Sequence, residues 1–195
     1  MSEVVTQLSD SLYSIFQSET FVLLNTVDQE SGGPTSSAIS WVYAVDHSKL
    51  RLALDHRSRL VGNLKANPRV TVTVFGQETI YAINGRATVV QDPLDGVPFN
   101  MCCFDIQIDA VRNALFYGAQ LVSPPEYAKV YDQRAADMLD RQVFEAMKKP
   151  SEVIARLFSI LGQTYRRFCR VVPPPGAICI CFGFTPSGGR VSFGS

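Results

Sequence analysis

Short runs in which apolar and polar residues alternate recur through the first half of this 195-residue chain. Residues 49–55 (KLRLALD) and 69–75 (RVTVTVF) each place an apolar side chain at every second position. That period of two is the period of a β-strand with one face in a core. Because the runs follow one another closely, antiparallel pairing is favoured over the long crossovers that parallel strands need. The pattern therefore predicts an antiparallel β-structure.

Three further strands are predicted in the same region. Residues 21–28 are a short apolar run, and a Gly-Gly-Pro turn separates them from residues 35–46. The second of these runs carries unusually small side chains on one face. Residues 79–90 form the third, with Asn84-Gly85 as a bulge or bend. Such closely spaced strands favour a closed or nearly closed barrel, because closure removes unpaired edges.

Helical periodicity appears before these strands and once between them, and it dominates after them. Residues 3–18 predict an amphipathic helix, and a short helix follows the basic turn that begins at Arg57. From about residue 104 to 163 the spacing is helical, with a long helix from Pro124-Pro125 to Pro150 and a second one capped by Ser151.

Strands are predicted to return after this insertion, at YRRFCRVV and AICICFGF. We therefore expect a mainly β (α+β) fold: a split antiparallel β-barrel with a helical insertion, residues 104–163, before the last strands. The simplest organisation is a single domain over residues 1–195.

The bulk composition limits the classes of partner. Lys plus Arg and Asp plus Glu balance at 18 each, so an overall field that attracts nucleic acid or an anionic membrane is not expected. The hydrophobic content of 46% fits a well-buried globular protein. The beginning of the chain lacks a secretion-signal pattern, and no apolar run reaches the roughly 20 residues of a membrane span. The expected location is the cytoplasm.

The five cysteines do not form a recognisable metal motif. Cys102 and Cys103 are adjacent, there is no CxxC pair, and the chain has only two histidines. An odd number of cysteines without a secretion signal favours reduced, buried thiols. We expect no metal site.

Arg57, Ser58 and Arg59 stand together at the start of the short helix. A helix N-terminus offers unpaired N–H groups and partial positive charge, and two guanidinium groups add strong donors for a phosphate. The alternative is that Ser58 is a plain N-cap and both arginines are solvated.

Other polar and aromatic residues allow two interpretations each. Asp55 and His56 could contact a ligand, or be a turn cap and a surface histidine. Trp41 could stack on a ligand, or belong to the core or an interface. A basic cluster at residues 166–170 could contact a phosphate or carboxylate from a partner subunit, or be a solvated strand face. No nucleophile–His–Asp arrangement is evident, so catalytic residues are not assigned, and a cofactor would carry the chemistry of any enzyme.

The order of motifs along residues 21–90 resembles the pyridoxamine 5'-phosphate oxidase-like, FMN-binding split barrels. A strand ends in Thr26-Val27-Asp28, a Gly33-Pro34 turn follows, and Ser58-Arg59 is followed by Asn63-Leu64 and Asn67-Pro68-Arg69-Val70. Thr185-Pro186 after the last strand also resembles the family. The resemblance covers about the first half of the chain and its final strand.

The resemblance implies a homodimer with FMN in the cleft between subunits and a small-molecule substrate of an oxidoreductase. The flavin phosphate would lie at the basic turn and the flavin ring beside the strand with small side chains. The cofactor-binding residues implied in this way are Ser37, Ala38, Ile39, Ser40, Trp41, Leu54, Asp55, Arg57, Ser58, Arg59 and Asn63.

Two positions depart from the family pattern. The family usually has Lys after the Ser-Arg pair, where this chain has Leu60, and many oxidases have Gln where we align Ile80. These departures favour the alternative function: a non-catalytic split-barrel protein that binds another phosphate-bearing ligand or heme. A purely structural dimerisation module ranks below both.

Overall fold

The computed structural model describes residues 5–76, 78–130 and 132–149, all of which lie in the compact unit Met1–Glu152. The other residues, including the predicted cap at Ser151, the strands after it and the basic cluster at 166–170, lie outside the described residues. That residues 1–195 form one domain stays a prediction.

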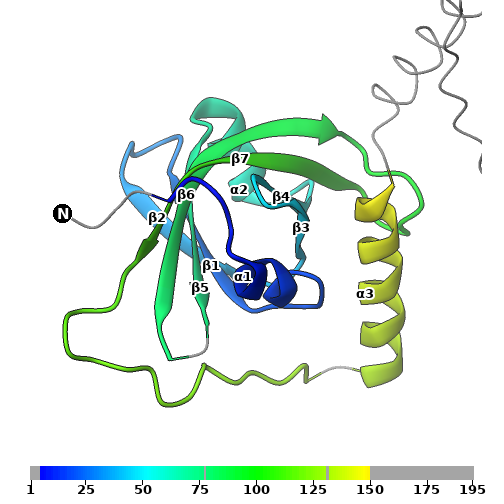
Figure 1. The fold of residues 1–195 in the computed structure, drawn as a ribbon. Helices are drawn as coiled ribbons and strands as arrows, with labels where there is room; N and C mark the ends of the chain where they lie inside the picture. Colours follow the sequence, from blue (N-terminus) through cyan, green and yellow to red (C-terminus); the bar gives the residue numbers. More distant parts are fainter. Residues whose placement is uncertain (1–4, 77, 131, 150–195) are drawn as a thin grey trace, which may run out of the picture. The chain divides into compact units, whose positions relative to one another are not determined.

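A single antiparallel sheet of seven strands dominates the described part of the chain (Figure 1). The strands stand in the order β2-β1-β5-β6-β7-β4-β3. Their bounds are Val22–Val27 for β1, Pro34–Ile39 for β2, Val42–Asp46 for β3, Lys49–Asp55 for β4, Arg69–Phe75 for β5, Ile80–Gln91 for β6 and Met101–Asn113 for β7. The three helices of this part are α1 Asp10–Ile15, α2 Arg59–Ala66 and α3 Gln133–Lys148.

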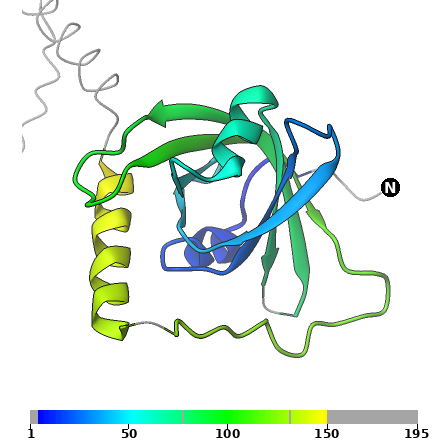
Figure 2. The ribbon, with the colours of Figure 1, turned by 180° about the vertical axis from the view of Figure 1, so that it is seen from behind.

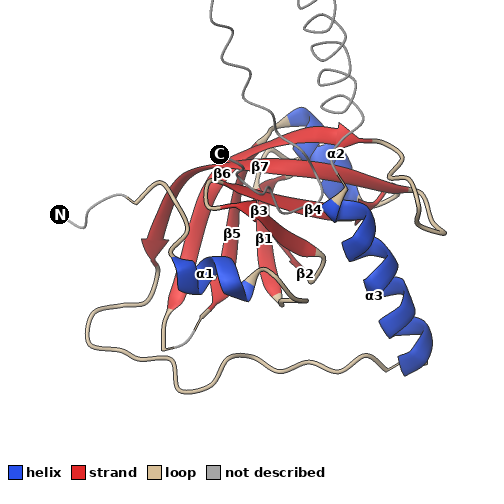
Figure 3. Cartoon of the chain, turned by 45° about the vertical axis from the view of Figure 1, so that its right-hand side comes forward, coloured by secondary structure: helices blue, strands red, loops and turns tan. Residues whose placement is uncertain are grey.

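The sheet curls into a barrel that stays open, which confirms the split barrel and not its full closure (Figure 3). Residues 35–46, predicted as one strand, are divided at Ser40-Trp41 into β2 and β3. The division arises because β2 pairs with β1 while β3 pairs with β4, at opposite ends of the strand order. Consecutive strands thus form the two edges of the sheet.

A large hydrophobic cluster fills the inside of the barrel. It draws one face of each strand together, for example Leu24 on β1, Leu52 on β4, Val72 on β5 and Phe104 on β7, and Phe16 after α1 is fully buried with them. Leu50, Leu52 and Leu54 all belong to this cluster, as the alternation in β4 predicts.

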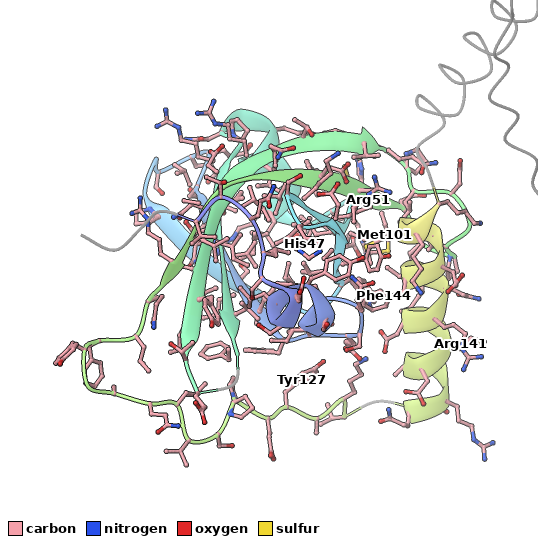
Figure 4. All side chains as sticks on the ribbon, viewed as in Figure 1. His47, Arg51, Met101, Tyr127, Arg141 and Phe144 are labelled. Atoms are coloured by element: carbon pink, nitrogen blue, oxygen red, sulfur yellow. The ribbon has the colours of Figure 1, made fainter. Side chains whose placement is uncertain are left out.

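Helix α3 covers the other face of β4 and β7, which the alternating pattern alone would leave to solvent. Ala53, Met101 and Cys103 pack there against Phe144 and Met147 of α3. Figure 4 shows Met101 and Phe144 between the barrel and this helix. Cys102 and Cys103 are both buried and free, which confirms the prediction for these two thiols.

The helical prediction for residues 104–163 was wrong over its first part. Met101–Asn113 forms β7, because it pairs with β4 along one side and with β6 along the other. The long helix begins at Gln133 rather than near Pro124, because the Asp132 side chain caps it by accepting from Ala135 N. Residues 114–130, predicted to be largely helical, instead cross beneath the barrel without a helix (Figure 1).

The N-terminal helix is shorter than the predicted residues 3–18. Ser9 caps α1 by accepting from Leu12 N, and Val5 already pairs with Val111 of β7. By contrast, the bulge predicted at Asn84-Gly85 is confirmed by a register shift between β6 and β7.

Candidate functional site

The basic turn lies where β4 ends and α2 begins. Ser58 is the N-cap of α2, and its side chain accepts from Leu60 N at 3.3 Å. Ser58 N donates to Asp55 O at 2.8 Å, so the turn is closed by its own backbone. Within the described residues, the backbone N–H of Arg59 has no acceptor. The turn therefore offers one backbone donor and two guanidinium groups to a ligand.

Arg57 is held by Asp55. The Asp55 carboxylate accepts from Arg57 N at 2.8 Å, from Nε at 3.2 Å and from Nη2 at 3.0 Å. The hydrogen bonds from Arg57, first from its side chain and then from its backbone, lower the pKa of Asp55 to about 2. The Arg57 side chain is 89% exposed, so its remaining N–H groups face solvent. Asp55 thus orients Arg57 and also competes with any anion for it.

Arg59 points away from Arg57, toward the strand β2. Its Nη2 donates to Thr35 Oγ1 at 3.1 Å. Arg59 and Thr35 line a hollow of ≈ 340 Å³ between α2 and the turn that joins β1 to β2. Asp28 and Glu30 line the same hollow, so Arg59 shares it with two carboxylates. Figure 2 shows α2 beside this turn.

Arg57 lines a different hollow, of ≈ 360 Å³, together with Asp55, His56, Phe99 and Asn100. The structure therefore does not bring the two guanidinium groups into one hollow, as the cradle hypothesis supposes. A phosphate at the turn would need Arg57 to turn from Asp55, or would be held from one side by Arg59 and from the other by Arg57.

His56 is tied to the end of β6. Its Nδ1 lies 2.9 Å from Asp92 Oδ1, and Lys65 Nζ donates to Asp92 Oδ2 at 2.9 Å. The hydrogen bond from Lys65 is the main reason that the pKa of Asp92 is lowered, so Asp92 stays an acceptor. Nε2 of His56 has no partner in the part of the chain that the structure describes, and His56 lines the same hollow as Arg57.

Two of the implied cofactor-binding residues are buried in the protein interior. Leu54 is in the barrel core. Asn63 is fully buried, and its side chain donates to Thr26 Oγ1 at 3.1 Å and accepts from Gln29 N at 3.0 Å. Asn63 therefore fastens α2 to β1 and the turn after it.

The strand with small side chains is an edge strand. Ser37, Ala38 and Ile39 of β2 pair with β1, and the exposure of β2 alternates along its length. Ser40 follows the strand and is half-buried. Thr35, Ser37 and Ile39 form a half-buried strip of β2, on the face where Arg59 contacts Thr35, and Ser36 and Ala38 lie on the exposed face.

Trp41 lies outside this strip. Its Nε1 donates to Asp140 Oδ1 of α3 at 2.9 Å, and its ring packs on the cluster under α3. The same carboxyl group binds Lys129, which also binds Glu19. In this chain Trp41 is part of the contact that holds α3.

The two departures from the family pattern have structural roles. The Leu60 side chain belongs to the barrel core, with the residue 4% exposed, so it offers no donor at the polar turn. Ile80 begins β6 opposite Phe75.

Sequence reasoning missed the residues that complete the two hollows. Thr35 beside Arg59, and Phe99 and Asn100 beside Arg57 and His56, come from segments far apart in the chain. Only an exposed Phe in a polar Pro/Gly-rich loop was available as a signal, and that signal is weak.

Residues 8–100 match the model of a protein family described as pyridoxamine 5'-phosphate oxidase. A protein provisionally named pyridoxamine 5'-phosphate oxidase from Lactobacillus delbrueckii is 20% identical, with 55% of this chain and 95% of that chain covered and a TM-score of 0.49. General Stress Protein 26 from Bacillus anthracis is 19% identical, with coverages of 53% and 91% and a TM-score of 0.45. A tagged HupZ from Group A Streptococcus is 14% identical, with coverages of 52% and 90% and a TM-score of 0.42.

Comparison with curated proteins finds no match. In the part of the chain that the structure describes, none of the helices has the length and apolar character needed to cross a membrane.

Proposed function

Residues 8–100 place this chain in the pyridoxamine 5'-phosphate oxidase-like family, and from that premise we propose that the protein is an FMN-dependent oxidoreductase acting on a small molecule. The basic turn before α2 is the observation that supports FMN. The turn carries the backbone N–H of Arg59 at a helix N-terminus, with the Arg59 guanidinium in the hollow on one side and the Arg57 guanidinium in the hollow on the other, and such donors suit a phosphate dianion.

In this proposal each residue has a separate role in binding FMN. Arg57 and Arg59 hold the phosphate, Ser58 fixes the helix start, and the small side chains Ser37 and Ala38 leave room for the flavin beside β2. Bound FMN would supply the redox chemistry, accepting or donating a hydride. The chain's own residues bind and orient, and Asn63 keeps α2 in place from the interior.

Two further parts of the proposal concern the setting of the site. We place the protein in the cytoplasm as a homodimer, with FMN in the cleft between two copies. The half-exposed strip on β2 is an edge of the sheet, which a second copy would cover.

A second candidate function is binding of another phosphate-bearing ligand or heme without redox catalysis. The carboxylates beside the arginines favour it: Asp55 binds Arg57, and Asp28 and Glu30 share the hollow of Arg59. Leu60 in the core, instead of a Lys at the turn, also removes one donor.

Titration of flavin-free protein with FMN, followed by quenching of flavin fluorescence, tests the proposal. Saturable binding that Arg57→Ala or Arg59→Ala weakens by about tenfold or more, as loss of a charge-assisted hydrogen bond implies, is the expected result. Arg112→Ala, an exposed arginine on β7 away from the turn, is the matched control and should bind as the parent does. Protein that ignores FMN would overturn the proposal and leave the second candidate.

A further inference from the structure

Two arginines stand directly opposite each other on neighbouring strands, away from the basic turn. Arg69 of β5 and Arg86 of β6 are paired in the antiparallel register, and both are exposed. Side chains in such a pair leave the same face of the sheet with Cβ atoms about 4.5–5.5 Å apart, and like charges placed so destabilise the pairing. The register therefore places two like charges side by side on one face of the sheet.

Among the described residues, one carboxylate compensates the pair. Arg86 Nε lies 3.3 Å from Asp109 Oδ2. Asp109 reaches that place because the register between β6 and β7 shifts at Gly85, where a Cβ would lie 2.4 Å from Gln107 O. Arg69 makes no side-chain hydrogen bond or ion pair with any residue that the structure describes. The three charged groups therefore leave one positive charge without a partner.

The surface of the sheet next to the two arginines carries polar side chains, and a hydrogen bond between them fixes their orientation. Thr71 Oγ1 donates to Asn84 Oδ1 at 2.8 Å, and this bond turns the amide nitrogen of Asn84 away from Thr71. Among the described residues, that nitrogen has no acceptor. Asn84 and Thr71 are themselves a cross-strand pair, and each lies two residues along its strand from Arg86 or Arg69, on the same face of the sheet. Two guanidinium groups and an amide N–H₂ are thus available as donors.

These groups line one hollow of ≈ 440 Å³, together with Val27 and Pro34 at its end toward β1 and β2. This hollow and the one that Arg59 lines share Pro34 only. We propose that the hollow binds the oxyanion group of a small ligand, a carboxylate or a phosphate, between Arg69 and Arg86. The oxyanion accepts from both guanidinium groups and from Asn84, and the apolar end accommodates the remainder of the ligand.

The proposal is independent of flavin binding, and its test removes the basic turn as a competing phosphate site. The full chain carrying Arg57→Gln and Arg59→Gln is titrated calorimetrically with inorganic phosphate and, separately, with acetate, at fixed ionic strength. The comparison of the two probes tells a phosphate site from a carboxylate site. In this background Arg69→Gln, Arg86→Gln and the control Arg112→Gln are each added, and circular dichroism confirms that each variant is folded.

We expect saturable binding of at least one probe, with Kd raised about tenfold or more by Arg69→Gln and by Arg86→Gln and changed less than about twofold by Arg112→Gln. We also expect Arg69→Gln to raise Tm in the absence of anion, because it removes the cross-strand repulsion, and to abolish the rise in Tm that the bound probe causes. The absence of binding by both probes, or equal loss of affinity in the Arg112→Gln control, would overturn the proposal.

Discussion

Replacement of Arg51 by Met should loosen α3 from the barrel. Arg51 is 6% exposed and reaches across three elements. It donates to both oxygens of Asp105 on β7, at 2.6 and 3.0 Å, and to Met147 O and Lys149 O at the end of α3, at 2.8 and 3.1 Å. The hydrogen bonds to Asp105 raise the pKa of Arg51 despite its burial. Figure 4 shows Arg51 on the side of the barrel that faces α3.

The size of the effect follows from the partner that the substitution leaves buried without its counter-charge. Met keeps the apolar stem but leaves the Asp105 carboxylate, whose side chain is 14% exposed, without its cation. Breaking a buried pair from one side costs about 3–5 kcal/mol, which in a protein of this size corresponds to a fall in Tm of roughly 6–20 °C. The exposed pair of Arg86 and Asp109 provides the control, and Arg86→Met should cost less than about 1 kcal/mol.

Urea unfolding measures the loss, and Trp41 tells where it occurs. Trp41 is the only tryptophan, and its Nε1 donates to Asp140 of α3. Its emission should therefore shift to longer wavelength in Arg51→Met already before global unfolding. The double variant Arg51→Met/Asp105→Leu should recover most of the lost stability, because no charge is then left buried. An Arg51→Met protein as stable as the parent, with unchanged Trp41 emission, would refute this account of how α3 is held.

Two further predictions concern the core of the sheet. Gly85→Ala should lower the free energy of unfolding in urea by on the order of 1–3 kcal/mol, because the added Cβ would lie 2.4 Å from Gln107 O. Gly33→Ala is the control and should be tolerated, because the nearest atom to its Cβ lies at 3.5 Å. Equal stability of the two variants would contradict the bulge. Burial raises the pKa of the Cys103 thiol from 9.0 to about 12, so between these values the folded protein keeps a proton that the unfolded chain has lost. The unfolding free energy should therefore fall as pH rises through this window, by up to about 1.4 kcal/mol per pH unit for this thiol. Cys103→Ala should make the dependence of unfolding free energy on pH shallower by that amount. An unchanged dependence in this variant would show that Cys103 ionises freely.

The strands were predictable because their pattern is local. Each alternating run, such as 69–75, records the burial of one face, and Asn84-Gly85 marks the bulge because only Gly tolerates the approach of the β7 backbone. Residues 101–113 contain the same alternation, at Phe104, Ile106 and Ile108. The helical periodicity farther along the chain obscures this alternation, so the predicted helical segment includes residues that belong to β7.

The contacts that depend on chain folding were not predictable. Ser58 as N-cap could be inferred from its neighbours, but the pairing of His56 with Asp92 joins residues 36 positions apart. The sequence alone allows either a ligand-binding or a core role for Trp41, and its contact with Asp140 depends on where α3 packs, 99 positions later. The division of Arg57 and Arg59 between two hollows likewise depends on Thr35 and Phe99, which local pattern does not place.

The comparison of FMN with riboflavin tests the central proposal most directly, because the two flavins differ only in the phosphate. Dissociation constants measured by fluorescence quenching should show FMN bound about 100-fold or more tighter than riboflavin, as two charge-assisted contacts imply. Arg57→Ala/Arg59→Ala should reduce that ratio to near one without weakening riboflavin binding. Equal affinity for both flavins in the parent protein would contradict the assignment of the turn before α2 as a phosphate site.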